Sequence, residues 1–182
     1  PPAGLGDIAE TLKQRGTEYD ALDMSVGDTP KDLRGRIQSF NPDLIGISMM
    51  SFMYKRSYDI IRLAKQVKPD VRIVAGGPHI STRREKVLEE CPEIDYGVFL
   101  EGEETVMELC EGKDESEIAG LVYKKDNRVA LNPERPFIDS LDNVPFPKYE
   151  RFPLNGYVTE EMGIVSSRGC PYGCTYCPVK AA

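Results

Sequence analysis

Three cysteines near the C-terminal end of the sequence have the type and spacing needed to hold an inorganic cluster. Cys170, Cys174 and Cys177 follow a C-x3-C-x2-C pattern, with glycines at 169 and 173 that tolerate positive φ and close contacts. Three thiolates could each bind one iron of a cubane and leave the fourth iron open to a small ligand. A structural zinc loop is the alternative, although zinc prefers four ligands and the sequence offers no fourth Cys or His nearby.

Composition and charge narrow the class of protein. The 182 residues carry 23 Lys and Arg against 30 Asp and Glu, and this net charge of −7 disfavours nucleic acid and anionic membranes as partners. No apolar run approaches the ~20 residues of a membrane span, and no signal peptide opens the sequence, so we expect a cytoplasmic protein. An odd total of five cysteines argues against a disulfide framework, and Cys91 and Cys110 are expected to be small buried hydrophobic residues.

Upstream of the cysteines, strand patterns alternate with helix patterns. Short apolar segments bounded by Pro, Gly or Asp predict buried strands at residues 43–48, 71–76 and 94–99. A further strand is predicted at residues 19–24, and helices at 8–15, 30–40, 58–67 and 103–111 and around Val87. This alternation predicts an α/β fold, a doubly wound parallel sheet with helices on both faces. Such a sheet normally begins with a strand, yet residues 1–6 lead directly into a helix, so we expect the first strand to be missing.

The end of the α/β region changes its pattern. Residues 120–124 and 128–131 predict a hairpin that turns at Asp126 and Asn127. Residues 132–157 are rich in proline and predict a linker, and residues 162–166 resemble one more short strand that leads into the cysteines. The predicted organisation is an α/β domain with a C-terminal hairpin at 1–131, a linker at 132–157 and the first elements of a second domain at 158–182.

The cysteine motif and several shorter motifs resemble a known family. The run from Ser166 to Pro178, with the aromatic Tyr176 before the last cysteine, resembles the cluster motif of the radical S-adenosylmethionine enzymes. GGPH at 76–79, GEET at 102–105 and PFP at 145–147 further resemble the subgroup that carries a cobalamin-binding domain before the radical domain. Members of this subgroup include radical methyltransferases and the anaerobic magnesium-protoporphyrin ester cyclase.

The resemblance implies a set of cofactors and roles. The three cysteines would hold a [4Fe-4S] cluster, its free iron would chelate S-adenosylmethionine, and Tyr176 would lie against the adenine. An electron from a donor such as flavodoxin or ferredoxin would then lead to a 5′-deoxyadenosyl radical that abstracts hydrogen from a small-molecule substrate, and cobalamin would deliver a methyl group. Residues 158–182 would be the first strand and cluster loop of a truncated (β/α) barrel, so we expect the isolated chain to be inert.

The resemblance also implies a cobalamin site where the predicted strands end. Ligands of doubly wound sheets lie outside the carboxyl ends of the strands, where serines could donate hydrogen bonds and adjacent glycines would admit a bulky nucleotide tail. The predicted cofactor-binding residues besides Tyr176 are Ser48, Met50, Ser51, Gly76, Gly77, His79, Glu101 and Gly102. Several of these residues also have a structural explanation that needs no cofactor. The glycines could form an ordinary strand-to-helix turn, and the methionine could pack in the core. The glutamates could be present because negative charge is favourable at the start of a helix.

His79 is the only histidine, and the cobalt-ligating motif D-x-H-x-x-G is absent from the sequence. Capping of the next helix is as good an explanation of His79 as ligation, and the resemblance implies cobalamin without a lower histidine ligand. Two rival functions remain open. A methylthiotransferase-like enzyme would place three more cluster cysteines in the first domain, and a non-catalytic corrinoid-binding or sensor module would not need the cysteine loop.

Overall fold

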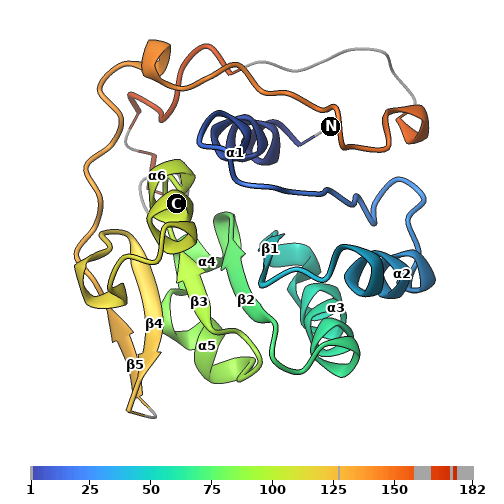
Figure 1. The fold of residues 1–182 in the computed structure, drawn as a ribbon. Coiled ribbons are helices and arrows are strands. Elements are labelled where there is room, and N and C mark those ends of the chain that lie inside the picture. The colour runs from blue at the N-terminus through green and yellow to red at the C-terminus, as the bar shows by residue number, and fades with distance from the viewer. Residues whose placement is uncertain (1, 127, 158–164, 173, 176–182) are drawn as a thin grey trace.

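The computed structural model describes residues 2–126, 128–157, 165–172 and 174–175, and it has an α/β fold built around a five-stranded sheet (Figure 1). β1 (Leu44–Ser48), β2 (Arg72–Gly76) and β3 (Tyr96–Val98) run parallel, and β4 (Leu121–Lys125) and β5 (Arg128–Leu131) extend the sheet as an antiparallel hairpin. The α/β class and the hairpin are confirmed. The parallel arrangement holds for β1 to β3, and the sheet as a whole is mixed, because the hairpin pairs directly with β3.

Six α-helices accompany these strands in the described part of the chain. They are α1 (Ala3–Gln14), α2 (Pro30–Phe40), α3 (Tyr54–Val67), α4 (Pro78–Arg83), α5 (Glu85–Glu90) and α6 (Glu103–Cys110). The start of α2 is fixed by a capping box between Thr29 and Asp32, and its end by Asn41 in the left-handed conformation. None of these helices is long and apolar enough to cross a membrane.

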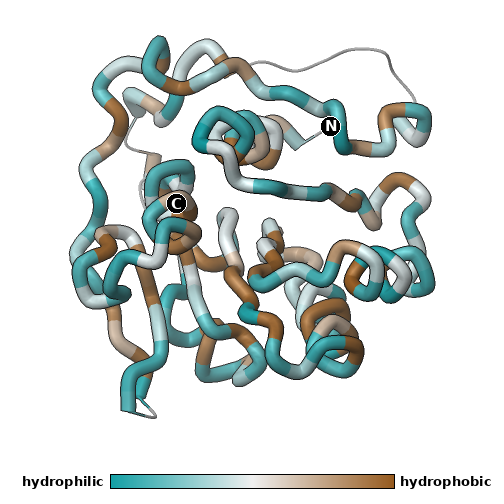
Figure 2. The backbone as a smooth tube through the Cα atoms, in the orientation of Figure 1, coloured by the Kyte–Doolittle hydropathy of each residue, from teal (hydrophilic) through white to brown (hydrophobic). Residues whose placement is uncertain are grey.

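The sheet has a hydrophobic core on each face. Alternate residues of a strand point to opposite faces, so Ile73 and Ala75 of β2 face one core while Val74 faces the other. The larger core also contains buried residues of α2, α3, α4 and α5, and the smaller one is closed by Leu109 of α6 and by Ile118. Helices therefore cover both faces, as predicted, and Figure 2 shows hydrophobic residues following the sheet and the helices packed on it.

The predicted strand at residues 19–24 is wrong, because this segment has no strand structure and runs as a loop from α1 towards α2 (Figure 1). Acidic side chains of the same loop accept hydrogen bonds from its backbone N–H groups. Asp23 accepts a hydrogen bond from the Ser25 N–H, and Asp28 accepts one from the Asp23 N–H. Local bonds of this kind compete with the ladder of a sheet. The predicted strand at 162–166 falls largely on residues 158–164, which lie outside the described residues.

The proline-rich segment after β5 returns across α1. In Figure 1, α1 lies beyond the upper ends of the parallel strands, and the segment passes over it. Tyr149 and Phe152 of this segment are buried against Ala9 of α1 in a third, small core. On the other side α1 packs against α6. The linker thus fixes α1 over the edge of the sheet at which β1, β2 and β3 end.

Candidate functional site

The carboxyl ends of the parallel strands meet at one edge of the sheet. Ser48, the last residue of β1, pairs in register with Gly76, the last residue of β2. The Gly76 carbonyl accepts a hydrogen bond from the Met49 N–H at 2.8 Å. A Cβ on Gly76 would lie 3.7 Å from the carbonyl oxygen of Val98, the last residue of β3. The structure therefore brings together the segments in which the sequence placed Ser48, Gly76 and Glu101.

Gly77 lets the loop after β2 pass directly over the loop after β1. Its φ of +89° and ψ of −176° are accessible essentially to glycine alone. A Cβ at this position would lie 3.0 Å from both the N and O atoms of Met49 and 3.1 Å from Ser48 Oγ. The His79 N–H then donates to the Met49 carbonyl at 3.0 Å. Gly77 thus allows the two loops to pack together at this edge of the sheet, which we call the glycine edge.

His79 is buried beneath this edge. Its ring stacks on Tyr54 with a centroid distance of 4.8 Å, and its Nδ1 lies 3.3 Å from Ser51 Oγ. Nε2 is buried and has no hydrogen-bond partner among the described residues. Burial lowers the pKa of His79 below its ordinary value, opposed by Glu90 and reinforced by Arg83. The structure therefore places this histidine in the packing between α3 and α4 as a neutral ring, with neither ring nitrogen free at the surface.

Two exposed apolar side chains lie beside the glycine edge. Met50 is 44% exposed, and Phe52, in the short 3-10 helix Ser51–Met53, is 79% exposed. Ser48 and Ser51 are exposed as well. These four side chains together offer apolar surface and hydroxyl groups at this place. Phe52 was not predicted from the sequence, and the only signal for it was its position four residues after the end of an apolar strand.

The residues that follow β3 carry a group of buried acids. The side chains of Glu101 and Glu103 are only 13% and 9% exposed, and that of Asp7, from α1, is 8% exposed. All three bind the guanidinium of Arg168. Burial raises the pKa of Asp7 above its ordinary value, and Arg168 opposes this effect. The sequence placed Glu101 and Gly102 at a cofactor site, and the structure shows the Glu101 carboxylate also accepting the Ile138 N–H at 2.6 Å.

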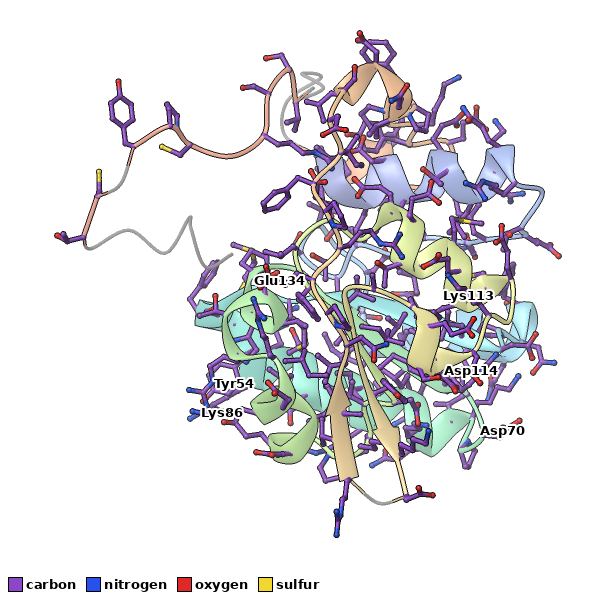
Figure 3. All side chains as sticks on the ribbon, turned by 90° about the vertical axis from the view of Figure 1, so that its left-hand side faces the viewer. Tyr54, Asp70, Lys86, Lys113, Asp114 and Glu134 are labelled. Carbon is purple, nitrogen blue, oxygen red and sulfur yellow. The ribbon has the colours of Figure 1, made fainter. Side chains whose placement is uncertain are left out.

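The cysteine motif begins two residues after Arg168. Cys170 and Cys174 are exposed free thiols, while Cys177 and Tyr176 lie outside the described residues. In Figure 3 the described part of this segment projects from the body of the domain on the side where Tyr54 is labelled. Within the described residues no group of three or more His, Cys, Asp or Glu side chains is arranged to hold a metal ion. The cluster ligation predicted for the three cysteines therefore stays a prediction.

Comparison with known proteins assigns the part of the chain that contains the glycine edge to a family. Residues 1–110, which contain β1, β2, β3 and the loops after them, match the B12 binding domain. The chain belongs to the B12-binding domain family. The glycine edge after β1 and β2 is thus part of a B12-binding domain.

Two curated relatives extend over almost the whole chain. One is an uncharacterised methyltransferase, PH0819, of Pyrococcus horikoshii, 35% identical over 187 residues that cover 97% of this chain and 40% of the relative. The other is the anaerobic magnesium-protoporphyrin IX monomethyl ester cyclase of Rubrivivax gelatinosus, 29% identical over 195 residues, 97% of this chain and 34% of the relative. The chain with its B12-binding domain therefore spans two fifths or less of these relatives, and they confirm the resemblance to methyltransferases and cyclases.

A solved structure supports the fold. The cobalamin-dependent S-adenosylmethionine radical enzyme OxsB, in its apo form, superposes with a TM-score of 0.74 at 24% sequence identity. The match covers 93% of this chain and 24% of that one. The B12-binding domain and the segment after it thus have the fold of a corresponding region in a larger protein.

Proposed function

We propose that this chain is the part of a radical S-adenosylmethionine enzyme that binds cobalamin and carries the ligands of a [4Fe-4S] cluster. The observation that carries the proposal is that one side chain, Arg168, ties a C-x3-C-x2-C segment to a B12-binding domain. The full reaction is proposed to be radical methyl transfer or oxidative cyclisation at an unactivated carbon of a small-molecule substrate. The electron is proposed to come from a cytoplasmic donor such as flavodoxin or ferredoxin.

The residues at the sheet edge fit a corrinoid. Gly76 and Gly77 carry no side chain and are partly exposed, so a ligand can approach their backbone from the solvent side. Ser48 and Ser51 are exposed and offer hydroxyl donors, while Met50 and Phe52 offer apolar surface to the ring. Bound cobalamin would supply a methyl group for transfer. The role of the protein at this edge is to bind and orient the cofactor.

The cysteine segment fits a cluster by its donor set. Thiolates are the ligands that iron–sulfur clusters prefer, and Cys170 and Cys174 are exposed and free of disulfides. Cys177 supplies the third thiol of the motif. The bound cluster would supply electrons to S-adenosylmethionine.

Titration with hydroxocobalamin tests the first half of the proposal. We expect a saturable change in the cobalamin absorption spectrum and an increase in Tm, because a ligand that binds only the folded state stabilises it. Unchanged spectra together with an unchanged Tm would refute cobalamin binding.

Anaerobic reconstitution with iron and sulfide tests the second half. We expect about four irons per chain and an absorption band near ~400 nm, as for a cubane cluster. Cys170→Ser should abolish this uptake, whereas Cys110→Ser, which changes an exposed thiol of α6, should leave it intact. Tight zinc without iron would refute the cluster, and cobalamin binding without iron would instead support a non-catalytic corrinoid-binding module.

A further inference from the structure

The described part of the cysteine segment is held to the domain by one side chain. Among residues 165–172 and 174–175, only Arg168 is not exposed. Its side chain is 24% exposed, and the hydrogen bonds that join this segment to other described residues are made by its guanidinium. Cys170 follows only two residues later, within about 7 Å of extended backbone.

The partners of Arg168 come from separate elements. Nη1 donates to Glu101 Oε1 at 3.1 Å, and Nη2 donates to Glu103 Oε1 at 2.5 Å and to Asp7 Oδ2 at 3.3 Å. Glu101 follows β3, Glu103 begins α6, and Asp7 lies in α1. The planar guanidinium presents donors in a fixed fork, so binding three acceptors specifies both its position and its orientation. Together we call Asp7, Glu101, Glu103 and Arg168 the carboxylate clamp.

The clamp has more negative than positive charge. When all three carboxylates are ionised, one guanidinium faces three negative charges, and each carboxylate side chain is at most 13% exposed. Glu103 Oε2 is buried and has no partner among the described residues. Buried carboxylates without a cation are unfavourable, so the acids favour a guanidinium at this place. This preference holds Arg168 in its docked position.

We propose that Arg168 is a positioning residue, which fixes the cysteine segment relative to the sheet edge that carries Gly76 and Gly77. That the segment holds a cluster and that the edge binds cobalamin rests on the proposed function. The docking of Arg168 on the three carboxylates does not depend on it. Gly169 has a φ of +79°, so the chain turns immediately after the clamp. The next residue, Cys170, is exposed. The clamp thereby sets where the thiols of the motif begin.

Distances between spin labels test this docking without any cofactor. In a chain with Cys110, Cys174 and Cys177 changed to Ser, one nitroxide is attached to Cys170 and another to Lys86→Cys, an exposed position of α5 labelled in Figure 3. Cys91 is fully buried and remains unlabelled. We expect a narrow distance distribution, which Arg168→Gln broadens about two-fold or more because the segment is released. Arg168→Lys keeps the charge without the fork and should restore part of the narrow distribution.

Matched variants separate docking from a general loss of structure. Glu103→Gln should broaden the distribution, whereas Glu104→Gln should not, because the neighbouring Glu104 is exposed and pairs with Arg15 instead. The triple variant Glu101→Gln, Glu103→Gln, Arg168→Gln leaves fewer unpaired charges than Arg168→Gln alone, and it should fold with a released segment. A narrow distribution in Arg168→Gln or in the triple variant would overturn the proposal, as would equal broadening by Glu103→Gln and Glu104→Gln.

The same variants distinguish a failure of the docking proposal from a failure of the proposed function. Arg168→Gln retains all three cysteines, so on reconstitution it should still take up about four irons per chain if the proposed function is right. If the unaltered chain takes up no iron, the proposed cluster fails, while the label distances still decide whether Arg168 docks the segment.

Discussion

Gly77 lies so close to Met49 that a Cβ on the glycine would sit 3.0 Å from both the N and O atoms of the methionine backbone. This contact joins the loop after β2 to the loop after β1, and the hydrogen bond from the His79 N–H to the Met49 carbonyl reinforces it. Backbone atoms cannot move aside as the end of a flexible side chain can. The packing of the two loops at the edge proposed to receive cobalamin therefore depends on glycine at this position.

Gly77→Ala should destabilise the domain. The φ and ψ of this residue lie in a region that costs other residues about 1–3 kcal/mol, and the contact with Met49 adds to that cost. Urea unfolding followed by far-UV circular dichroism measures the loss, since the chain has no tryptophan. Gly35→Ala, in an open position of α2, is the matched control and should be neutral or stabilise by up to about 1 kcal/mol. Equal stability of the two variants would contradict the argument.

Gly6→Ala should destabilise as well, although alanine normally favours a helix over glycine. A Cβ on Gly6 would lie 2.6 Å from Tyr149 Cε1 and 2.7 Å from Pro147 Cβ, so it would push the linker away from α1. Overpacking of this kind costs about 1–3 kcal/mol. Gly4→Ala lies in the same helix with nothing within 4 Å and should stabilise instead. A stabilised Gly6→Ala in urea unfolding would show that the linker does not pack on α1 in solution.

Phe52→Ser should weaken hydroxocobalamin binding about ten-fold, because covering part of an aromatic ring contributes about 1–2 kcal/mol. The ring is 79% exposed, so its removal should leave the unfolding midpoint in urea unchanged. Phe146→Ser is the control, since that ring is equally apolar and 75% exposed but lies in the proline-rich segment. Absorbance titrations of both variants compare the dissociation constants, and equal values would remove Phe52 from the proposed site.

Local signals predicted most of the elements. Thr29, Pro30 and Asp32 specify the start of α2 within four consecutive residues, and the helix runs over residues 30–40 as predicted. The parallel strands β1 and β2 were also predicted to within one residue, because each is a short apolar run bounded by turn residues. The glycine edge followed from the rule that ligands bind where parallel strands end.

Features that depend on distant residues were not predicted. Residues 19–24 have the composition of a strand, but Asp23 and Asp28 bind the backbone nearby and the segment stays a loop. The glutamates at the start of α6 are explained locally by the helix dipole, and nothing in the sequence links them to Arg168, which is 65 residues from Glu103. Such pairings become visible only when the fold brings the elements together.

The one histidine contributes a pH dependence to the stability of the domain, and this contribution can be measured separately from that of the other titrating groups. His79 is 4% exposed, and burial lowers its pKa, with Glu90 opposing and Arg83 reinforcing the effect. Ser51, Tyr54 and Tyr58 complete its surroundings. Because the pKa is lower in the folded state, the unfolded chain binds the proton more readily between the two pKa values. Stability contributed by neutral His79 is therefore fully present above about pH 6.5 and is lost as the pH falls towards the folded pKa.

We expect the free energy of unfolding to decrease between pH 7.5 and 5.5, by at most about 1.4 kcal/mol for each pH unit below the ordinary histidine pKa. His79→Gln removes the titrating ring, so the stability of that variant should change much less over this range, even if its absolute stability is lower. Urea unfolding at four pH values measures both slopes. The acids with lowered pKa values, such as Glu93 and Glu108, lose their stabilising effect only at lower pH, below the ordinary carboxyl range. Equal slopes in the two proteins would mean that the His79 ring is solvated in the folded state, and the packing of His79 against Tyr54 would then be wrong.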